Sequence, residues 1–187
     1  AQGPNPGSQS CSQAGGCAVI FSYPMYRDLE KDQTVLAGIA APRPIGADLS
    51  FRNKTGSGEG TIVSGSYFPT LGLRPALGRL LGPDDDRTVG GHPVVVLSYH
   101  YWTNELGSDP SVLDQTILVN GETMTIVGVA PKGFEGTTLG VRPRIFAPIT
   151  MSRALTGWLG GYEQRHTYWL YVFGRLAPGG TPEQAAQ

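Results

Sequence analysis

The sequence predicts an α+β fold, because its expected helices, strands and hairpins follow one another without the regular strand–helix alternation of a parallel α/β sheet. Its 187 residues include 27 glycines and 15 prolines, which favour many turns and short elements. Hydrophobic residues make up 40% of the chain and charged residues 16%. This balance indicates a folded chain with an apolar core, in one domain or in two small ones that share a core.

The first helix is predicted over residues 22–33. Ser22 is a good N-cap, and Pro24 falls in the first turn, where its missing N–H removes no helical hydrogen bond. Met25 and Leu29 stand one turn apart, so we expect these two side chains to face the core.

Strands are predicted where β-branched and aromatic residues gather between turn residues. The clearest pair flanks Asn120-Gly121, a dipeptide that suits a two-residue type I′ turn because both positions need positive φ. The glycine-rich segment 53–60 is predicted to be the loop of a second hairpin. The predicted strands are 35–40, 47–52, 61–63, 93–97, 116–119, 122–129, 145–149 and 169–176, and short helical segments are predicted at 67–71, 98–106 and 109–113.

The strand predicted over 169–176 is apolar on both faces, which is typical of a central strand. We expect it to pack against helix 22–33. Three rings, Trp169, Tyr171 and Phe173, share one face, and the alternative to core packing is that they stack on a sugar or a base.

Charge and hydropathy argue against several classes of protein. The 14 basic residues are scattered among 15 acidic ones, so the chain lacks the positive field of a nucleic-acid binder. No stretch approaches the ~20 apolar residues of a membrane helix, and Ala1 is not followed by a signal peptide. Thr181 caps a helix that has little room to continue. We therefore expect a fragment of a larger protein, truncated at its C-terminus.

Cys11 and Cys17 are the only cysteines, and they lie in a polar segment, 1–20, that is predicted to be loop. A zinc site usually needs four ligands, and a redox motif needs the spacing Cys-x-x-Cys. We therefore predict a disulfide between Cys11 and Cys17, which favours an oxidising compartment. Two free thiols in a cytosolic protein are the alternative.

Three features resemble ligand sites, and each has a simpler structural explanation. The acidic run 84–86 suits Ca²⁺ chemically but lacks the glycine and distal glutamate of an EF-hand loop, so a solvated turn is predicted. The run 56–60 lacks the Gly-Lys-Ser/Thr of a phosphate loop, which favours a flexible hairpin tip. His92, His100 and His166 form no metal-binding pattern.

Ser98 is the one serine placed like a hydrolase nucleophile, between a buried strand and a helix. Val96 and His100 stand where that motif requires glycine, so Ser98 is predicted to be a helix cap. The sequence therefore predicts a non-enzymatic chain with no catalytic, cofactor-binding or metal-binding residue.

Residues 65–79 (GSYFPTLGLRPALGR) resemble a motif in the periplasmic core domain of MacB-type ABC transporter permeases. The opening stretch, 21–29, looks more specifically like the duplicated orphan permeases of acidobacteria. The resemblance continues through 96–98, 101–102, Gly107, 109–112, 117–121, 126–131 and 133–134, in the order and spacing of the family.

This resemblance implies a porter-like βαβ subdomain, formed by 21–50 and 167–187, which is interrupted by a β-rich, sabre-like insertion at 51–166. Residues 1–20 would be an N-terminal loop with the disulfide. The domain would lie on the periplasmic face of the inner membrane and couple cytoplasmic ATP hydrolysis to substrate handling, by mechanotransmission. Its partners would be its own membrane helices, a separate ABC ATPase, and a periplasmic adaptor or second permease copy. The resemblance supplies no catalytic residue or cofactor.

Two other functions stay open at this stage. The first is a binding module that captures a ligand or a partner protein, which a deep apolar pocket would favour. The second is a secreted hydrolase that uses Ser98 or the loop at Asp84, which needs a base within hydrogen-bond reach of the nucleophile.

Overall fold

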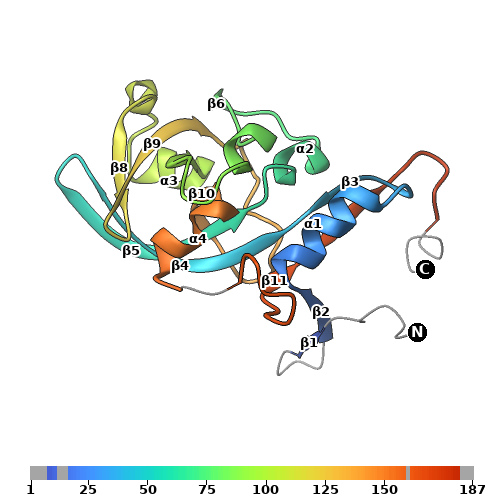
Figure 1. The fold of residues 1–187 in the computed structure, drawn as a ribbon. Coiled ribbons are helices and arrows are strands. Elements are labelled where there is room, and N and C mark those ends of the chain that lie inside the picture. The colour runs from blue at the N-terminus through green and yellow to red at the C-terminus, as the bar shows by residue number, and fades with distance from the viewer. Residues whose placement is uncertain (1–7, 12–16, 159–160, 182–187) are drawn as a thin grey trace, which may run out of the picture.

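The computed structural model describes residues 8–11, 17–158 and 161–181 (Figure 1). Within these ranges the chain forms three β-sheets, one helix of ten residues and several shorter helical segments. Strands predominate, and the predicted α+β class is confirmed. The helix predicted to begin at Thr181 falls on residues 182–187, which lie outside the described ranges.

The largest sheet closes on itself. In this part of the chain β8 pairs with both β4 and β9, so six strands form a ring, and β6 (Leu77–Gly78) adds to β9 outside it. Around the ring the strands are β4 (Pro42–Phe51), β5 (Lys54–Val63), β10 (Pro143–Pro148), β7 (Val94–Leu97), β9 (Glu122–Val129) and β8 (Thr116–Val119). We call this ring the barrel.

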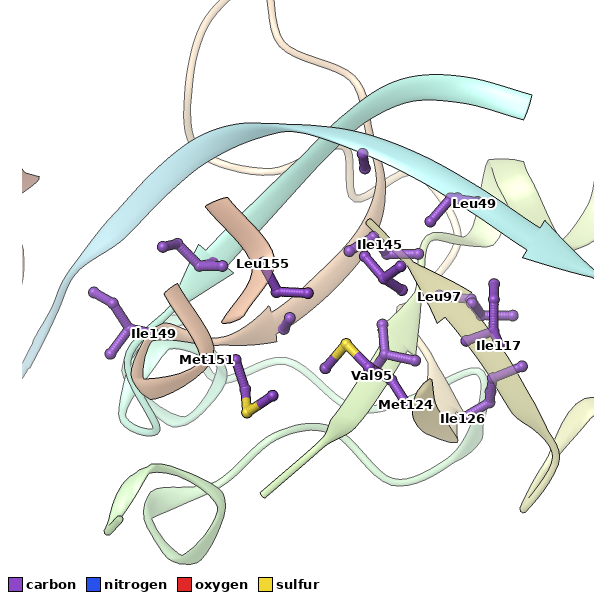
Figure 2. Packing of buried hydrophobic residues seen from close by; sticks show 14 of the residues in the cluster. Leu49, Val95, Leu97, Ile117, Met124, Ile126, Ile145, Ile149, Met151 and Leu155 are labelled. Carbon is purple, nitrogen blue, oxygen red and sulfur yellow. The ribbon is translucent and has the colours of Figure 1, made fainter. Parts of the chain in front are cut away.

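Apolar side chains fill the barrel, as is usual for a ring of this size. Strand β8 shows the alternation that produces this packing: Ile117 and Val119 are buried, whereas Leu118 between them is 42% exposed. Figure 2 shows the packing of the core, with labelled residues that come from β4 (Leu49), β7 (Val95, Leu97), β8 (Ile117), β9 (Met124, Ile126), β10 (Ile145) and the segment that follows it (Ile149, Met151, Leu155).

One of the two predicted hairpins is confirmed and the other is wrong in detail. Asn120 and Gly121 have φ values of 51° and 87° and join β8 to β9 as predicted. The segment 53–60 is not a loop, because β5 begins at Lys54 and pairs with β4 along its whole length. Arg52 and Asn53 make the turn instead, with φ values of 46° and 63°.

The glycines of β5 make room for an arginine and do not form a flexible tip. A Cβ added at Gly56 would lie 2.9 Å from Nη1 of Arg144, and one added at Gly58 would lie 2.5 Å from its Nε. The sequence alone could not reveal this neighbour, because Arg144 comes from β10, far along the chain.

The predicted helix over 22–33 is confirmed as α1 (Tyr23–Asp32), and the Ser22 side chain accepts a hydrogen bond from the backbone N–H of Met25. The prediction of its buried face is wrong. Leu29 is 37% exposed and Met25 is partly exposed, whereas Tyr26 is fully buried. The inward face is therefore turned by one position, toward the tyrosines.

Two small sheets lie beside the barrel. The first contains β1 (Ser8–Cys11), β2 (Cys17–Phe21) and β11 (Leu170–Tyr171), so the prediction that 1–20 is all loop is wrong. The second, which we call the ribbon, pairs β3 (Leu36–Ala40) with β12 (Phe173–Leu176) along one side of α1 (Figure 1).

The strand predicted over 169–176 is therefore divided, with its two parts in different sheets. Each part lies at the edge of its sheet within the described residues, so the expectation of one central strand is wrong. By contrast, β3 and β4 are separated by Ala41 alone, and the chain passes almost directly from the ribbon into the barrel.

Short helical segments complete the described fold, and none of its helices is long and apolar enough to cross a membrane. These segments are α2 (Tyr67–Leu71), α3 (Tyr99–Asn104), α4 (Ser152–Thr156) and single 3-10 turns at Pro83–Asp86, Pro110–Val112 and Ile149–Met151.

The close packing of β6 and Arg79 on β9 predicts a steep cost for a side chain at Gly128 in β9. A Cβ at this position would lie 1.9 Å from the backbone oxygen of Arg79, and backbone atoms cannot move aside as a flexible side chain can. We expect Gly128→Ala to lower the free energy of unfolding by about 3 kcal/mol or more, measured by urea denaturation. The matched control is Gly46→Ala in β4, where an added Cβ meets nothing within 4 Å. Equal denaturation midpoints for the two variants would contradict this account of the close approach between Arg79 and Gly128.

Candidate functional site at the junction of helix, ribbon and barrel

The candidate functional site is a structural junction, where α1, α2, the ribbon and the turn at 83–87 meet beside the barrel (Figure 1). The described residues contain no group of three or more histidine, cysteine, aspartate or glutamate side chains that could hold a metal ion. The features that characterise the junction are its packing and its buried polar groups.

A chain of hydrogen bonds runs from α1 to the point where the ribbon becomes the barrel. The Tyr26 hydroxyl donates to Oε1 of Glu30 at 2.7 Å and lies 2.9 Å from Oγ of Ser66. Since its one proton goes to the carboxylate, Ser66 donates to Tyr26, and Ser64 in turn donates to Ser66 over 3.0 Å. Ser64 Oγ accepts from the backbone N–H of Ala41 at 3.0 Å.

Burial keeps this chain of hydrogen bonds in one protonation state. Removal from water raises the pKa of Tyr26 well above its ordinary value, even though the hydrogen bond from Ser66 acts in the other direction. The phenol therefore stays protonated throughout the physiological range. It donates to Glu30 within α1, and the hydrogen bond that it accepts from Ser66 ties α1 to the 64–66 segment.

Aromatic rings make the second connection of α1. The Tyr23 ring stacks on Trp169 with 6.3 Å between ring centroids, and it meets Tyr162 edge-on at 5.2 Å. The predicted contact between the first helix and the 169–176 segment is thus confirmed, although it is made by Tyr23. An exposed ion pair between Asp28 and Arg165, 2.7 Å apart, adds a weaker link between α1 and the loop that also carries Tyr162.

Arg43 ties the start of β4 to the same rings. Its guanidinium lies 4.9 Å from the ring centroid of Trp158 and 5.1 Å from that of Trp169, in cation–π geometry. Burial lowers the pKa of Arg43 from its usual value, and the two ring faces partly replace the water that the cation has lost.

Helix α2, which belongs to the 65–79 stretch, packs the ribbon onto the barrel. Its backbone oxygen at Thr70 accepts a 2.6 Å hydrogen bond from Nε of Arg175 in β12, and a Cβ at Gly38 in β3 would lie 2.7 Å from Oγ1 of Thr70. The Tyr67 ring meets Phe173 of β12 edge-on at 5.8 Å and lies 6.3 Å from Phe146 of the barrel.

The acidic run 84–86 is not a solvated turn, because two of its three carboxylates are buried. Asp84 is exposed and pairs with Arg87. Asp85 accepts two hydrogen bonds from Arg79, at 2.7 and 2.8 Å. Burial raises the pKa of Asp85, but the Arg79 contacts and the hydrogen bond from the backbone N–H of Gly82 together outweigh burial, and the net pKa is lowered. The three acids thus serve separate partners and do not converge on one ion.

Asp86 holds two segments of the junction together. Its carboxylate is 4% exposed and accepts hydrogen bonds from the backbone N–H groups of Gly65, at 3.0 Å, and Thr150, at 3.3 Å. Desolvation raises the pKa of Asp86 to about 6, against the lowering effect of these hydrogen bonds. Beside it opens a hollow of 210 Å³ that is also lined by Arg27 and Glu30 of α1.

Ser98 is a helix cap, as predicted. Its side chain is buried and accepts a 3.2 Å hydrogen bond from the backbone N–H of Tyr101. In the described part of the chain no histidine or carboxylate makes a hydrogen bond with Ser98, so the geometry does not support its use as an activated nucleophile.

Sequence reasoning missed three residues of the junction: Tyr26, Arg43 and Asp86. A pattern that could have identified Tyr26 was present, because Tyr23 and Tyr26 are three positions apart on α1 and Glu30 follows four positions later. Neither Arg43 nor Asp86 had such a pattern, because their partners are distant in sequence.

Comparison with known proteins places this geometry in a family. The sequence model for the MacB-like periplasmic core domain matches residues 3–187. The periplasmic region of MacB from Actinobacillus actinomycetemcomitans is similar in structure, with a TM-score of 0.70 and 16% identity over 89% of this chain and 69% of that one. The extracellular domain of YknZ, a noncanonic ABC-type transporter from Gram-positive bacteria, has a TM-score of 0.65 and 14% identity over 89% and 77%. No curated protein matches the sequence.

The raised pKa of Asp86 predicts an unusual pH dependence of stability. The Asp86 carboxyl holds its proton more tightly in the folded state than in the unfolded chain, where its pKa is near 3.8. The stabilisation that results is therefore complete below pH 3.8. As pH rises from 4 through 6 the stabilisation is lost, and the free energy of unfolding should fall by about 3 kcal/mol from this group. Denaturant titrations across this range, compared with Asp86→Asn, isolate the contribution.

The matched control for this experiment is Asp84→Asn, since Asp84 is exposed. We expect Asp84→Asn to keep the wild-type slope between pH 4 and 6 and Asp86→Asn to flatten it. A wild-type slope in Asp86→Asn would show that Asp86 does not titrate in this window.

Proposed function

This chain belongs to the family of MacB-like periplasmic core domains, and we propose that it acts as a mechanical coupler in an ABC-type permease. In this proposal ATP is hydrolysed in a separate cytoplasmic domain or subunit. Membrane helices of the permease pass the resulting motion to α1 and the ribbon, at the extracytoplasmic face of the inner membrane. The domain catalyses no reaction itself, and a periplasmic adaptor or a second permease copy would receive the motion.

The observation that supports this proposal best is the unbroken connection from α1 to the barrel. Hydrogen bonds link Tyr26 through Ser66 and Ser64 to Ala41, and Ala41 is the one residue between the ribbon and β4. A displacement of α1 would therefore reach the barrel through directional contacts and continuous backbone. Such contacts transmit motion better than an apolar interface on which elements can slide.

We also propose the division into a porter-like part, 21–50 with 167–187, and a sabre-like part, 51–166, preceded by 1–20. Pairing of β2 with β11 and of β3 with β12 supports this division, because it brings the two ends of the chain together. The two parts would share β4, which begins beside the ribbon and then forms part of the barrel wall.

Hydrogen exchange in the complete transporter tests the coupling without knowledge of the substrate. We expect trapping of the ATPase with ATP and vanadate to change amide exchange in α1, in the ribbon and in the 64–71 segment. In Tyr26→Phe the change should remain in α1 and no longer reach 64–71, because the phenyl ring keeps the packing but loses the hydrogen bonds.

The matched control is Tyr99→Phe, which removes a hydroxyl from α3, away from the junction. It should keep the wild-type pattern of exchange. Absence of any nucleotide-dependent change in α1, or a wild-type pattern in Tyr26→Phe, would refute the proposed route.

We further propose that Cys11 and Cys17 form a disulfide. In the β1–β2 pair these two residues lie directly opposite each other. Opposite Cα atoms in antiparallel strands are about 4.5 to 5.5 Å apart, which is within the range that a disulfide spans. Maleimide labelling of the unreduced protein should modify neither cysteine, and labelling after reduction should modify both. Modification of both without a reductant would show that the thiols are free.

A further inference from the structure

Asn120 connects three elements of the barrel region at the end of β8. Its backbone N–H donates to the backbone oxygen of Asp48 in β4 at 2.9 Å, and its side-chain oxygen accepts from the backbone N–H of Asp48 at 2.7 Å. Its side-chain nitrogen donates to the backbone oxygens of Gly46 in β4, at 2.9 Å, and Leu155 in α4, at 2.7 Å. Asn120 therefore extends the pairing of β4 with β8 and connects α4 to it. We call the three side-chain hydrogen bonds the Asn120 clamp.

The Asn120 clamp requires an amide. Both N–H groups of the side-chain nitrogen donate, and the side-chain oxygen accepts. A carboxylate has no proton to donate, so it would face the oxygens of Gly46 and Leu155 with like partial charge. The oxygen of Leu155 belongs to the end of a short helix, where backbone oxygens have no partner within the helix. Loss of the amide would therefore leave two backbone oxygens without their donor.

The same asparagine precedes Gly121, and this dipeptide favours loss of the side-chain amide because glycine has no Cβ to hinder its backbone nitrogen. The nitrogen of Gly121 attacks Cγ of Asn120, so an N–Cγ bond forms and the Cγ–Nδ2 bond breaks. The side-chain nitrogen takes up the proton of the Gly121 N–H and leaves as ammonia. Water then opens the succinimide ring and gives aspartate or isoaspartate.

We propose that Asn120 is a deamidation site that the folded domain protects, and that deamidation there abolishes the Asn120 clamp. For the attack, the side chain must turn its Cγ toward the nitrogen of Gly121, and its own nitrogen must leave Gly46 and Leu155. Both movements break the clamp, so the reaction proceeds from an opened state of the turn. Its product cannot form the clamp again. This site does not depend on the proposed mechanical coupling.

The turn between β4 and β5 offers a matched comparison. Asn53 has a φ of 63° there, close to the 51° of Asn120, and both turns join antiparallel strands. The side chain of Asn53 makes no hydrogen bond within the described part of the chain, so this turn has no clamp. Because Lys54 follows Asn53, the variant Lys54→Gly provides a second Asn-Gly dipeptide in which the asparagine side chain is free.

The experiment measures deamidation at both sites in the 187-residue Lys54→Gly chain, incubated at mildly alkaline pH and analysed by peptide mapping with mass spectrometry. In the folded chain we expect Asn120 to react at least about tenfold more slowly than Asn53, because three hydrogen bonds must break first. In guanidinium chloride the difference should fall sharply, because both turns are unfolded. Equal rates in the folded chain, or the same ratio in guanidinium chloride, would overturn the proposal.

The wild-type chain gives a second measurement, which holds even if Lys54→Gly disturbs the fold. Asn120 should react at least about tenfold more slowly in the folded chain than in guanidinium chloride. A rate at Asn120 that is the same in both conditions would show that the fold gives no protection.

Variants that carry the product's charge test the consequence of the reaction. Asn120→Asp should lower the urea midpoint, whereas Asn53→Asp, which adds the same charge to a turn without a clamp, should stay close to the wild type. The loss in Asn120→Asp should shrink below the ordinary aspartate pKa of ~3.9, because a protonated carboxyl can donate to one of the two backbone oxygens. Equal midpoints for Asn120→Asp and Asn53→Asp would contradict the proposed loss of the clamp.

Discussion

Closure of the barrel is the constraint on which the rest of the fold depends, and it rests on β9. One side of β9 pairs with β7, and the other side pairs first with β8 and then with β6. Backbone must pass very close to backbone where β6 leads into the next segment, and Gly128 permits this approach to Arg79. Where the ring closes, β8 covers one part of the β9 edge and β6 covers another part, so the elements of the junction attach to the outer surface of the ring or continue its strands.

The junction uses both of these ways of attachment. Helix α2 packs on the outer surface of the barrel through Tyr67 and Phe68, and β4 continues the ribbon directly into the ring. Apolar packing fills the barrel, whereas buried polar contacts, among them those of Tyr26 and Asp86, hold the junction. Hydrogen bonds in a buried setting need particular partners at particular angles, so they fix one arrangement of α1 where apolar contacts would allow several.

Local features of this fold were predictable from the sequence, and features set by distant partners were not. The Ser22 and Ser98 caps and the Asn120-Gly121 turn follow from neighbouring residues, and all three are confirmed. The 53–60 segment was misassigned because its glycines suggested a loop, while their actual neighbour, Arg144, lies in another strand. The strand at 169–176 was misjudged for a similar reason, since two different partners, β2 and β3, divide it between sheets.

The residues that carry the family resemblance mainly serve packing, and this has a physical consequence. Residues 65–79 form α2, the approach to β6 and the arginine that pairs with Asp85, all of which serve packing. Such a stretch specifies a shape, which explains how a sequence with no assigned catalytic residue can still identify its fold. Arg144, Gly56 and Gly58 lie outside the stretches that resemble the family, although they pack closely together in the barrel wall.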